Sequence, residues 1–222
     1  MTTVEQAGTG ELWASVPEQF TPIDLAEDFE TRVLRTIRQA EYALPGSTPE
    51  QRMHLALAQE AMIGKMLEQG VRYAATCVAK TEDERPSLTM ANLTVTFQAA
   101  ELTGLDPLGA IANGLKTKNP KAKQEIGYLN LPVGRTLAIA DEVKFTPPTS
   151  AFGVPSDREH VVRQASAVIP HPHGTRIVII GMSTEFLTEW TLYTEMFRAI
   201  LETVSFEPPR KPSSIASRLG GF

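Results

Sequence analysis

The chain of 222 residues contains a single cysteine, Cys77, and only four histidines. One cysteine cannot form an internal disulfide, and it cannot supply the paired thiolates that most structural zinc sites use. The histidines are too scattered to assemble a Ser-His-Asp arrangement, and no run of carboxylates has the spacing of a calcium loop. We therefore expect a protein without catalytic residues, without a cofactor and without a metal site.

Basic residues are absent from the first 30 positions, which hold seven acidic side chains. A signal peptide has the reverse character, with a basic start and an apolar middle, and no apolar run approaches the roughly 20 residues of a bilayer span. We expect a cytoplasmic protein with no membrane span. The remaining chain balances 21 basic against 19 acidic residues, so it lacks the basic stripe that a nucleic-acid partner requires.

The length suits one domain flanked by two short segments. Residues 1–22 show no hydrophobic period, and we interpret them as a mobile acidic leader whose Trp13 and Phe20 could dock on the body or on a partner. Residues 23–206 form the single domain. Residues 207–222 are rich in proline and serine and predict a mobile tail, in which Ile215, Leu219 and Phe222 could form a short docking helix.

Two helices are expected before the first strand. Apolar residues from Phe29 to Leu44 follow a 4-4-3-4 spacing, which places them on one face of a helix. The second helix has a capping box: Thr48 is the N-cap, Pro49 follows at the first helical position, and Gln51 stands three residues after the cap. Gly70 is its expected end.

Period-2 alternation over residues 71–79 and 91–98 predicts an antiparallel strand pair. A short helix is expected from Asp106 and Pro107 to Leu115. Residues 126–131 and 136–140 flank a turn at 132–134 and predict a second hairpin. Three prolines and a glycine mark 146–157 as a surface loop.

The other elements are expected to pack around the stretch from His160 to Val204. It predicts a strand at 160–169, a turn at 170–174 and an unbroken apolar strand at 177–180 that is covered on both faces. A helix follows with a 4-3-4-3-4 stripe, formed by Phe186, Trp190, Tyr193, Phe197, Ile200 and Val204. That stripe must lie across the sheet. The fold class predicted is α+β: an α/β/α sandwich with a mainly antiparallel sheet, N-terminal helices and a C-terminal amphipathic helix packed on it.

This order of elements resembles the PsbP-like and Mog-type family of α/β/α sandwiches, and in particular its small bacterial members. Four stretches carry the resemblance, which extends over residues 24–206: GVRYAA at 70–75, LPVGR at 131–135, AVIPHPHG at 167–174 and IIGMST at 179–184. Members of the family act as accessory subunits of photosystem II, as a partner of a small GTPase, and as bacterial adapters. The resemblance implies no catalytic residue. This chain lacks the export signal of the bacterial lipoprotein members.

Two motifs could carry chemistry. His171 and His173 lie two residues apart in the turn, where they could bind a metal, but a zinc site needs three or four converging ligands and His160 lies at the far end of a strand. We therefore interpret both histidines as turn residues. The neighbouring prolines make this exposed hairpin tip rigid, and it could serve as a recognition surface. Cys77 could be a nucleophile if a histidine lowered its pKa. However, it lies on the apolar side of an alternating strand, where a free cysteine is more often a small core residue.

Residues 109–117 nearly spell a phosphate-binding loop, but Leu115 separates the second glycine from Lys116, and the segment lies in an expected helix. We interpret the match as chance. The lysines from Lys116 to Lys123 could attract an acidic partner, but we favour the interpretation that they form a solvated loop.

The function predicted is a non-catalytic protein-binding or accessory module, adapter-like and associated with secretion or with a larger complex. Its expected contacts are Trp13 and Phe20, the tip with His171 and His173, and the tail residues Ile215, Leu219 and Phe222. The alternative is a small-molecule or substrate-binding domain, which needs a concave apolar pocket with a few polar groups. A third candidate is a weak hydrolase that uses Cys77.

Overall fold

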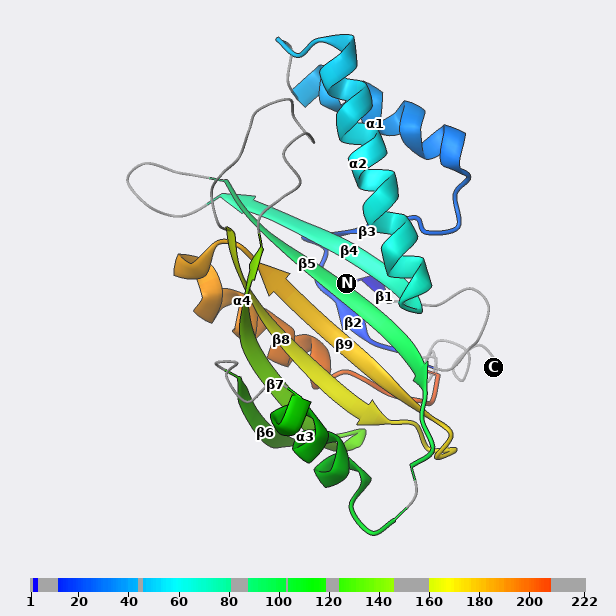
Figure 1. The fold of residues 1–222 in the computed structure, drawn as a ribbon, viewed down its shortest axis with the longest axis vertical. Coiled ribbons are helices and arrows are strands. Elements are labelled where there is room, and N and C mark those ends of the chain that lie inside the picture. The colour runs from blue at the N-terminus through cyan, green and yellow to red at the C-terminus, as the bar shows by residue number, and fades with distance from the viewer. Residues whose placement is uncertain are drawn as a thin grey trace, which may run out of the picture.

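The structure is a computed structural model that describes residues 2–3, 12–43, 46–80, 88–102, 104–118, 124–145 and 160–208. Its main feature is one antiparallel seven-stranded sheet with helices packed against it, which confirms the predicted α+β fold. From edge to edge the strands are β3 (Phe20–Ile23), β4 (Val71–Lys80), β5 (Leu88–Ala99), β9 (Arg176–Thr184), β8 (His160–Pro170), β7 (Gly134–Phe145) and β6 (Glu125–Leu131) (Figure 1). Two short strands, β1 (Thr2–Thr3) and β2 (Ser15–Val16), form a separate pair.

The strand expected to be covered on both faces, β9, is the fourth of the seven and pairs with β5 and β8. Its side chains alternate between two cores. Val178 and Ile180 belong to the larger core, whereas Ile177 and Ile179 pack into the smaller one on the other face. Apolar residues on both faces are what a central strand requires.

The aromatic stripe lies on α4 (Trp190–Leu201), which a short 3-10 helix, η1 (Leu187–Glu189), precedes. Tyr193, Phe197 and Ile200 are buried against the sheet in the larger core. The hydroxyl groups of Tyr193 and Thr89 are hydrogen-bonded over 3.1 Å, which ties α4 to β5. The prediction that this helix lies across the sheet is confirmed.

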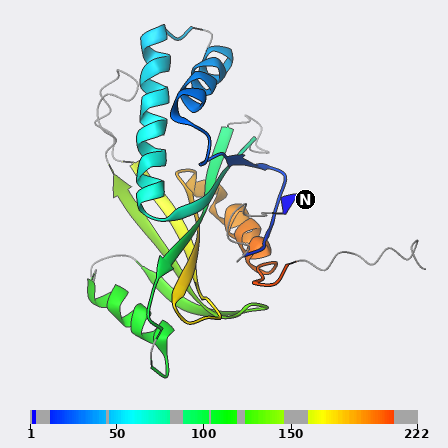
Figure 2. The ribbon, with the colours of Figure 1, turned by 90° about the vertical axis from the view of Figure 1, so that its right-hand side faces the viewer.

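The opposite face of the sheet carries α3 (Pro107–Lys118). Leu108 and Ala112 pack with Leu137 and Val168 in the smaller core. The side chain of Asp106 accepts a hydrogen bond from the backbone N–H of Gly109 (3.1 Å) and so begins the helix as expected. Figure 2, where the sheet is seen nearly edge-on, shows α4 on one side and α2 and α3 on the other.

The remaining helices, α1 (Phe29–Ala43) and α2 (Pro49–Glu68), pack together (Figure 1), and α2 also contacts β4. The capping box at the start of α2 is present, with Gln51 N–H donating to Thr48 and the Gln51 side chain accepting from Thr48 N–H. Gly70 has a φ of 78° where the chain turns from α2 into β4, a conformation that favours glycine.

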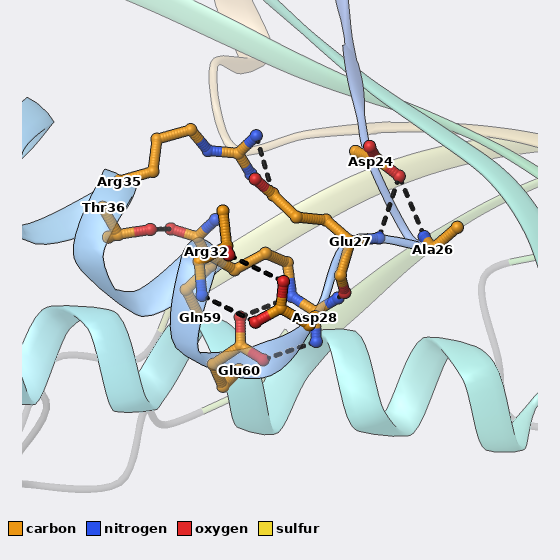
Figure 3. A network of polar contacts seen from close by, with 10 residues as sticks. Asp24, Ala26, Glu27, Asp28, Arg32, Arg35, Thr36, Gln59 and Glu60 are labelled. Atoms are coloured by element: carbon orange, nitrogen blue, oxygen red, sulfur yellow. Dashed lines mark hydrogen bonds and ion pairs between the residues drawn. The ribbon is translucent and has the colours of Figure 1, made fainter.

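A buried ion pair joins α1 to α2 (Figure 3). The Arg32 guanidinium donates two hydrogen bonds to the Glu60 carboxylate, at 2.8 and 2.7 Å, and a third to the backbone carbonyl of Glu27. These bonds to Glu60 raise the pKa of Arg32 further above its ordinary value. Both side chains are less than a tenth exposed, so the two charges must stay together.

The prediction of a mobile leader over residues 1–22 is wrong for its second half. Leu12, Ala14 and Val16 are buried in the larger core together with residues of α4, and β3 joins the sheet beside β4. Backbone hydrogen bonds in both directions between Trp13 and Ser205 hold this segment to the end of the folded body. Leu12, Ala14 and Val16 are spaced two apart because this segment is extended. Three alternating positions are too few to be recognised as a strand in the sequence.

No helix in the described part of the chain is long and apolar enough to cross a bilayer. The expected surface loop at 146–157 and the expected tail from residue 209 onward lie outside the described residues.

Candidate functional site

An apolar groove of about 440 Å³ lies between α4 and strands β6, β7 and β8. Its floor is built from side chains no larger than a methyl group on three adjacent strands: Gly127, Ala138, Ala140, Ala165 and Ala167. The pairing of Gly127 with Ala138, and of Ala138 with Ala167, sets these small residues side by side. We call this hollow the α4 groove.

One wall of the α4 groove comes from α4 itself, through Thr194, Phe197, Arg198 and Leu201. The helix lies over the centre of the sheet, so the same face of β6 and β7 is left without a covering helix in the described residues. Large side chains on those strands would fill the space. Because the floor is glycine and alanine, the groove stays open.

The α4 groove has charged groups from two of its lining elements: Arg198 from helix α4 and Glu125 from strand β6. Arg198 is exposed and its guanidinium is 3.0 Å from the carboxylate of Glu202, one turn further along α4. An exposed pair of this kind contributes little to stability. Arg198 can therefore exchange Glu202 for a negatively charged group on a bound molecule at small cost.

Sequence reasoning missed the α4 groove, although a signal for it exists. Alanine and glycine occupy every second position on neighbouring strands, as in Ala138 with Ala140 and Ala165 with Ala167. Alternation of apolar and polar residues predicts a strand, but it does not distinguish small apolar residues from large ones. Small residues at the same face of paired strands indicate room above that face.

The turn with the two histidines forms a second hollow, of about 680 Å³, with the β6–β7 turn and residues 204–207. His171 is buried, 5% exposed, and its ring contacts those of His173 and Phe206 with centroids 4.9 Å apart in each case. The backbone N–H of His173 donates to Nδ1 of His171 over 3.3 Å. His171 is therefore a packed residue, contrary to the expectation of an exposed tip, while His173 is exposed.

Among the described residues no three His, Cys, Asp or Glu side chains are grouped as metal ligands would be. The two histidines contact each other and an aromatic ring, so the interpretation of a turn held by packing fits the geometry better than a metal site does.

The N-terminal residues expected to contact a partner are not free surface. Phe20 is 2% exposed in the larger core, opposite Cys77 on β4. Trp13 is half-buried, and its backbone is bridged to Ser205. Of the proposed partner-contacting residues, His173 has the exposed side chain, and Ile215, Leu219 and Phe222 lie outside the described residues.

Cys77 is buried at 1% exposure on β4, paired with Phe20 on one side and Ala91 on the other. Burial raises the pKa of its thiol, so the nucleophilic thiolate is disfavoured at neutral pH. These facts favour the interpretation of Cys77 as a small core residue over a catalytic one.

The near match to a phosphate loop lies within α3, which runs from Pro107 to Lys118. Its backbone N–H groups are therefore used in the helix from its second turn onward and cannot cradle a phosphate. Lys116 and Lys118 are exposed in the last turn of α3, where they compensate the helix dipole.

Comparison with models of known protein families finds no match, and no curated protein sequence matches the chain. The resemblance to PsbP-like and Mog-type proteins therefore stays a prediction.

Proposed function

We propose that the protein is a non-catalytic binding module that holds an apolar, helical segment of a partner protein in the α4 groove. The observation that carries the proposal is the groove itself: an apolar hollow with a floor of glycine and alanine and a wall of aromatic and aliphatic side chains. Concave apolar surfaces with few polar groups are the usual binding sites of proteins.

A helix is the occupant that suits the shape of the α4 groove. A sheet normally carries helices side by side on a face, and α4 covers the centre of this face while β6 and β7 remain uncovered in the described residues. A partner helix placed beside α4 would complete that layer. The alanine floor lets its backbone come close, and Phe197 and Leu201 offer apolar contacts along its flank.

Two further points support a module without chemistry of its own. Cys77 is buried, and its pKa is raised by burial, which is unfavourable for the alternative of a hydrolase that uses this thiol. The proteins that the sequence resembles serve as accessory subunits and adapters. The buried thiol and this resemblance are both consistent with an accessory protein, which the sequence predicts to be cytoplasmic.

The proposal is tested by filling the groove. In Ala138→Leu and Ala140→Leu, the larger side chain occupies the floor; in the control, Ala110→Leu, the same change is made at an exposed position of α3. Each tagged chain is used for capture from native extract. A protein recovered by the wild type and the control but lost by both groove variants supports the proposal, and its binding is then measured by calorimetry. A protein recovered equally by all four chains contradicts it.

The second candidate is a small amphipathic molecule with a carboxylate or phosphate group. It is favoured by the volume of the α4 groove, about 440 Å³, which lies within the usual range of small-molecule sites. Arg198 would bind the anionic group. Native mass spectrometry of the purified protein tests this candidate: an adduct that Ala140→Leu and Arg198→Gln both remove would favour a small molecule over a partner helix.

A further inference from the structure

The two edges of the sheet differ in how they are protected. β3 has four residues and carries the exposed Pro22, which cannot donate a backbone hydrogen bond to a further strand. β6 has seven residues, and none of them is a proline, a lysine or an arginine. Within the described residues β6 pairs on one side alone, with β7. An unprotected edge of this length is a template for another strand.

The side chains of β6 add to this contrast. Tyr128 is 43% exposed and Leu129 is 39% exposed, two large apolar residues next to each other on the outermost strand. The Tyr128 ring is held in place by the guanidinium of Arg135, 4.0 Å from the ring centroid, and Arg135 is in turn 3.4 Å from the carboxylate of Asp106 at the start of α3. The exposed ring therefore lies beside a cation that α3 helps to position.

We propose that β6 is the contact between two copies of the chain, which pair β6 with β6 in an antiparallel arrangement across a twofold axis at Tyr128. The sheet then continues from one copy into the other. Twofold dimers with self-complementary contacts are the commonest oligomers, and addition of a strand to an open edge is a recurrent mode of association.

The sequence of β6 permits this register. With the axis at Tyr128 the whole strand overlaps, and the facing pairs are Glu125 with Leu131, Ile126 with Asn130, Gly127 with Leu129, and Tyr128 with its copy. The one charge, Glu125, faces an apolar residue and never its own copy, so no like charges meet. Two tyrosine rings come side by side at the axis, a favourable cross-strand pair.

The Tyr128 side chain and the α4 groove lie on opposite faces of β6. Glu125, Gly127 and Leu129 line the groove, and because side chains alternate along a strand, Tyr128 points to the other face. A substitution at Tyr128 therefore tests the dimer without filling the groove, and the two proposals can fail separately.

The experiment is a charge exchange at the axis. In Tyr128→Lys and in Tyr128→Glu, two like charges face each other across the twofold axis, whereas an equal mixture of the two variants places opposite charges there. The molar mass is measured by light scattering during gel filtration at about 100 μM, because a contact formed by one strand falls in the weak, transient class. We expect the wild type to be dimeric, each variant to be monomeric, and the mixture to regain the dimer.

Thr21→Lys on β3, at the other edge, is the matched control and should remain dimeric. Circular dichroism confirms that each variant is folded, and recovery of the dimer on mixing shows the same independently. A wild type that is monomeric at this concentration overturns the proposal. So does a dimer that persists in both Tyr128 variants, or one that Thr21→Lys abolishes while the Tyr128 variants keep it.

Discussion

At the scale of single residues, two tyrosines with buried hydroxyl groups differ in one hydrogen bond. The hydroxyl of Tyr193 is bonded to that of Thr89 over 3.1 Å. The hydroxyl of Tyr73 is buried and has no hydrogen-bond partner within the described residues, and burial raises its pKa. A buried polar group without a partner costs free energy that a bonded one does not.

The same substitution at both positions should therefore have opposite effects. Tyr73→Phe removes the unpaired hydroxyl, and we expect the free energy of unfolding to rise by about 1 kcal/mol; Tyr193→Phe leaves Thr89 unpaired, and we expect a fall of about 1 to 2 kcal/mol. Urea unfolding followed by circular dichroism measures both values. Equal destabilisation by the two variants would show that Tyr73 has a partner or that its hydroxyl is reached by water.

Cys77 makes stability depend on pH in the alkaline range. Because burial raises the pKa of its thiol above the ordinary value of 9.0, the folded chain keeps the proton at a pH where the unfolded chain releases it. The stabilisation is fully present below that value and is lost as the pH rises through it. Urea unfolding between about pH 7 and pH 10 should show a decline that is shallower in Cys77→Ala. Identical slopes for both chains would contradict a buried thiol.

At the scale of elements, the pairing of α1 with α2 depends on the ion pair of Arg32 with Glu60. Each partner is less than a tenth exposed, and one charge left alone in such a place is strongly unfavourable. By contrast, the pair of Arg35 with Glu27, at 2.8 Å, has an arginine that is 38% exposed, and pairs of this kind contribute little.

Removing one partner tests this difference. We expect Glu60→Ala to lower the free energy of unfolding by about 3 kcal/mol, and the double variant Arg32→Met with Glu60→Leu to recover most of that loss. Arg35→Ala serves as the control and should cost less than about 1 kcal/mol. If Glu60→Ala and Arg35→Ala had the same small effect, the pair between the helices would have to be hydrated.

The elements were largely predictable from the sequence because their signals are local. Alternation predicted β4 and β5, a capping box fixed the start of α2, and the aromatic stripe placed α4 on the sheet. The segment from Leu12 to Val16 was not predicted to be buried, because its role depends on contacts with distant residues, such as that of Trp13 with Ser205, 192 positions away. The ion pair of Arg32 with Glu60 was not predicted either, because it depends on how α1 and α2 pack against each other.

At the scale of the whole molecule, α4 determines which part of the sheet face stays open. It covers the centre of one face of the sheet, and the small residues of β6, β7 and β8 leave the α4 groove beside it. The partner-contacting residues predicted from the sequence are large side chains of the N-terminal segment, the histidine turn and the tail, whereas the structure has a hollow with alanines in its lining. A hollow arises from side chains of several strands together, so no single segment of sequence reveals it.

Site-specific photo-crosslinking from Ala140 tests the α4 groove most directly. A photoreactive amino acid at Ala140 lies on the groove floor, and the same group at the exposed Ala110 of α3 is the control. After irradiation in the native extract, we expect one partner protein to be joined covalently to the chain with the Ala140 probe and not to the chain with the Ala110 probe. Crosslinks of the same pattern from both positions, or from Ala110 alone, would contradict binding in the groove.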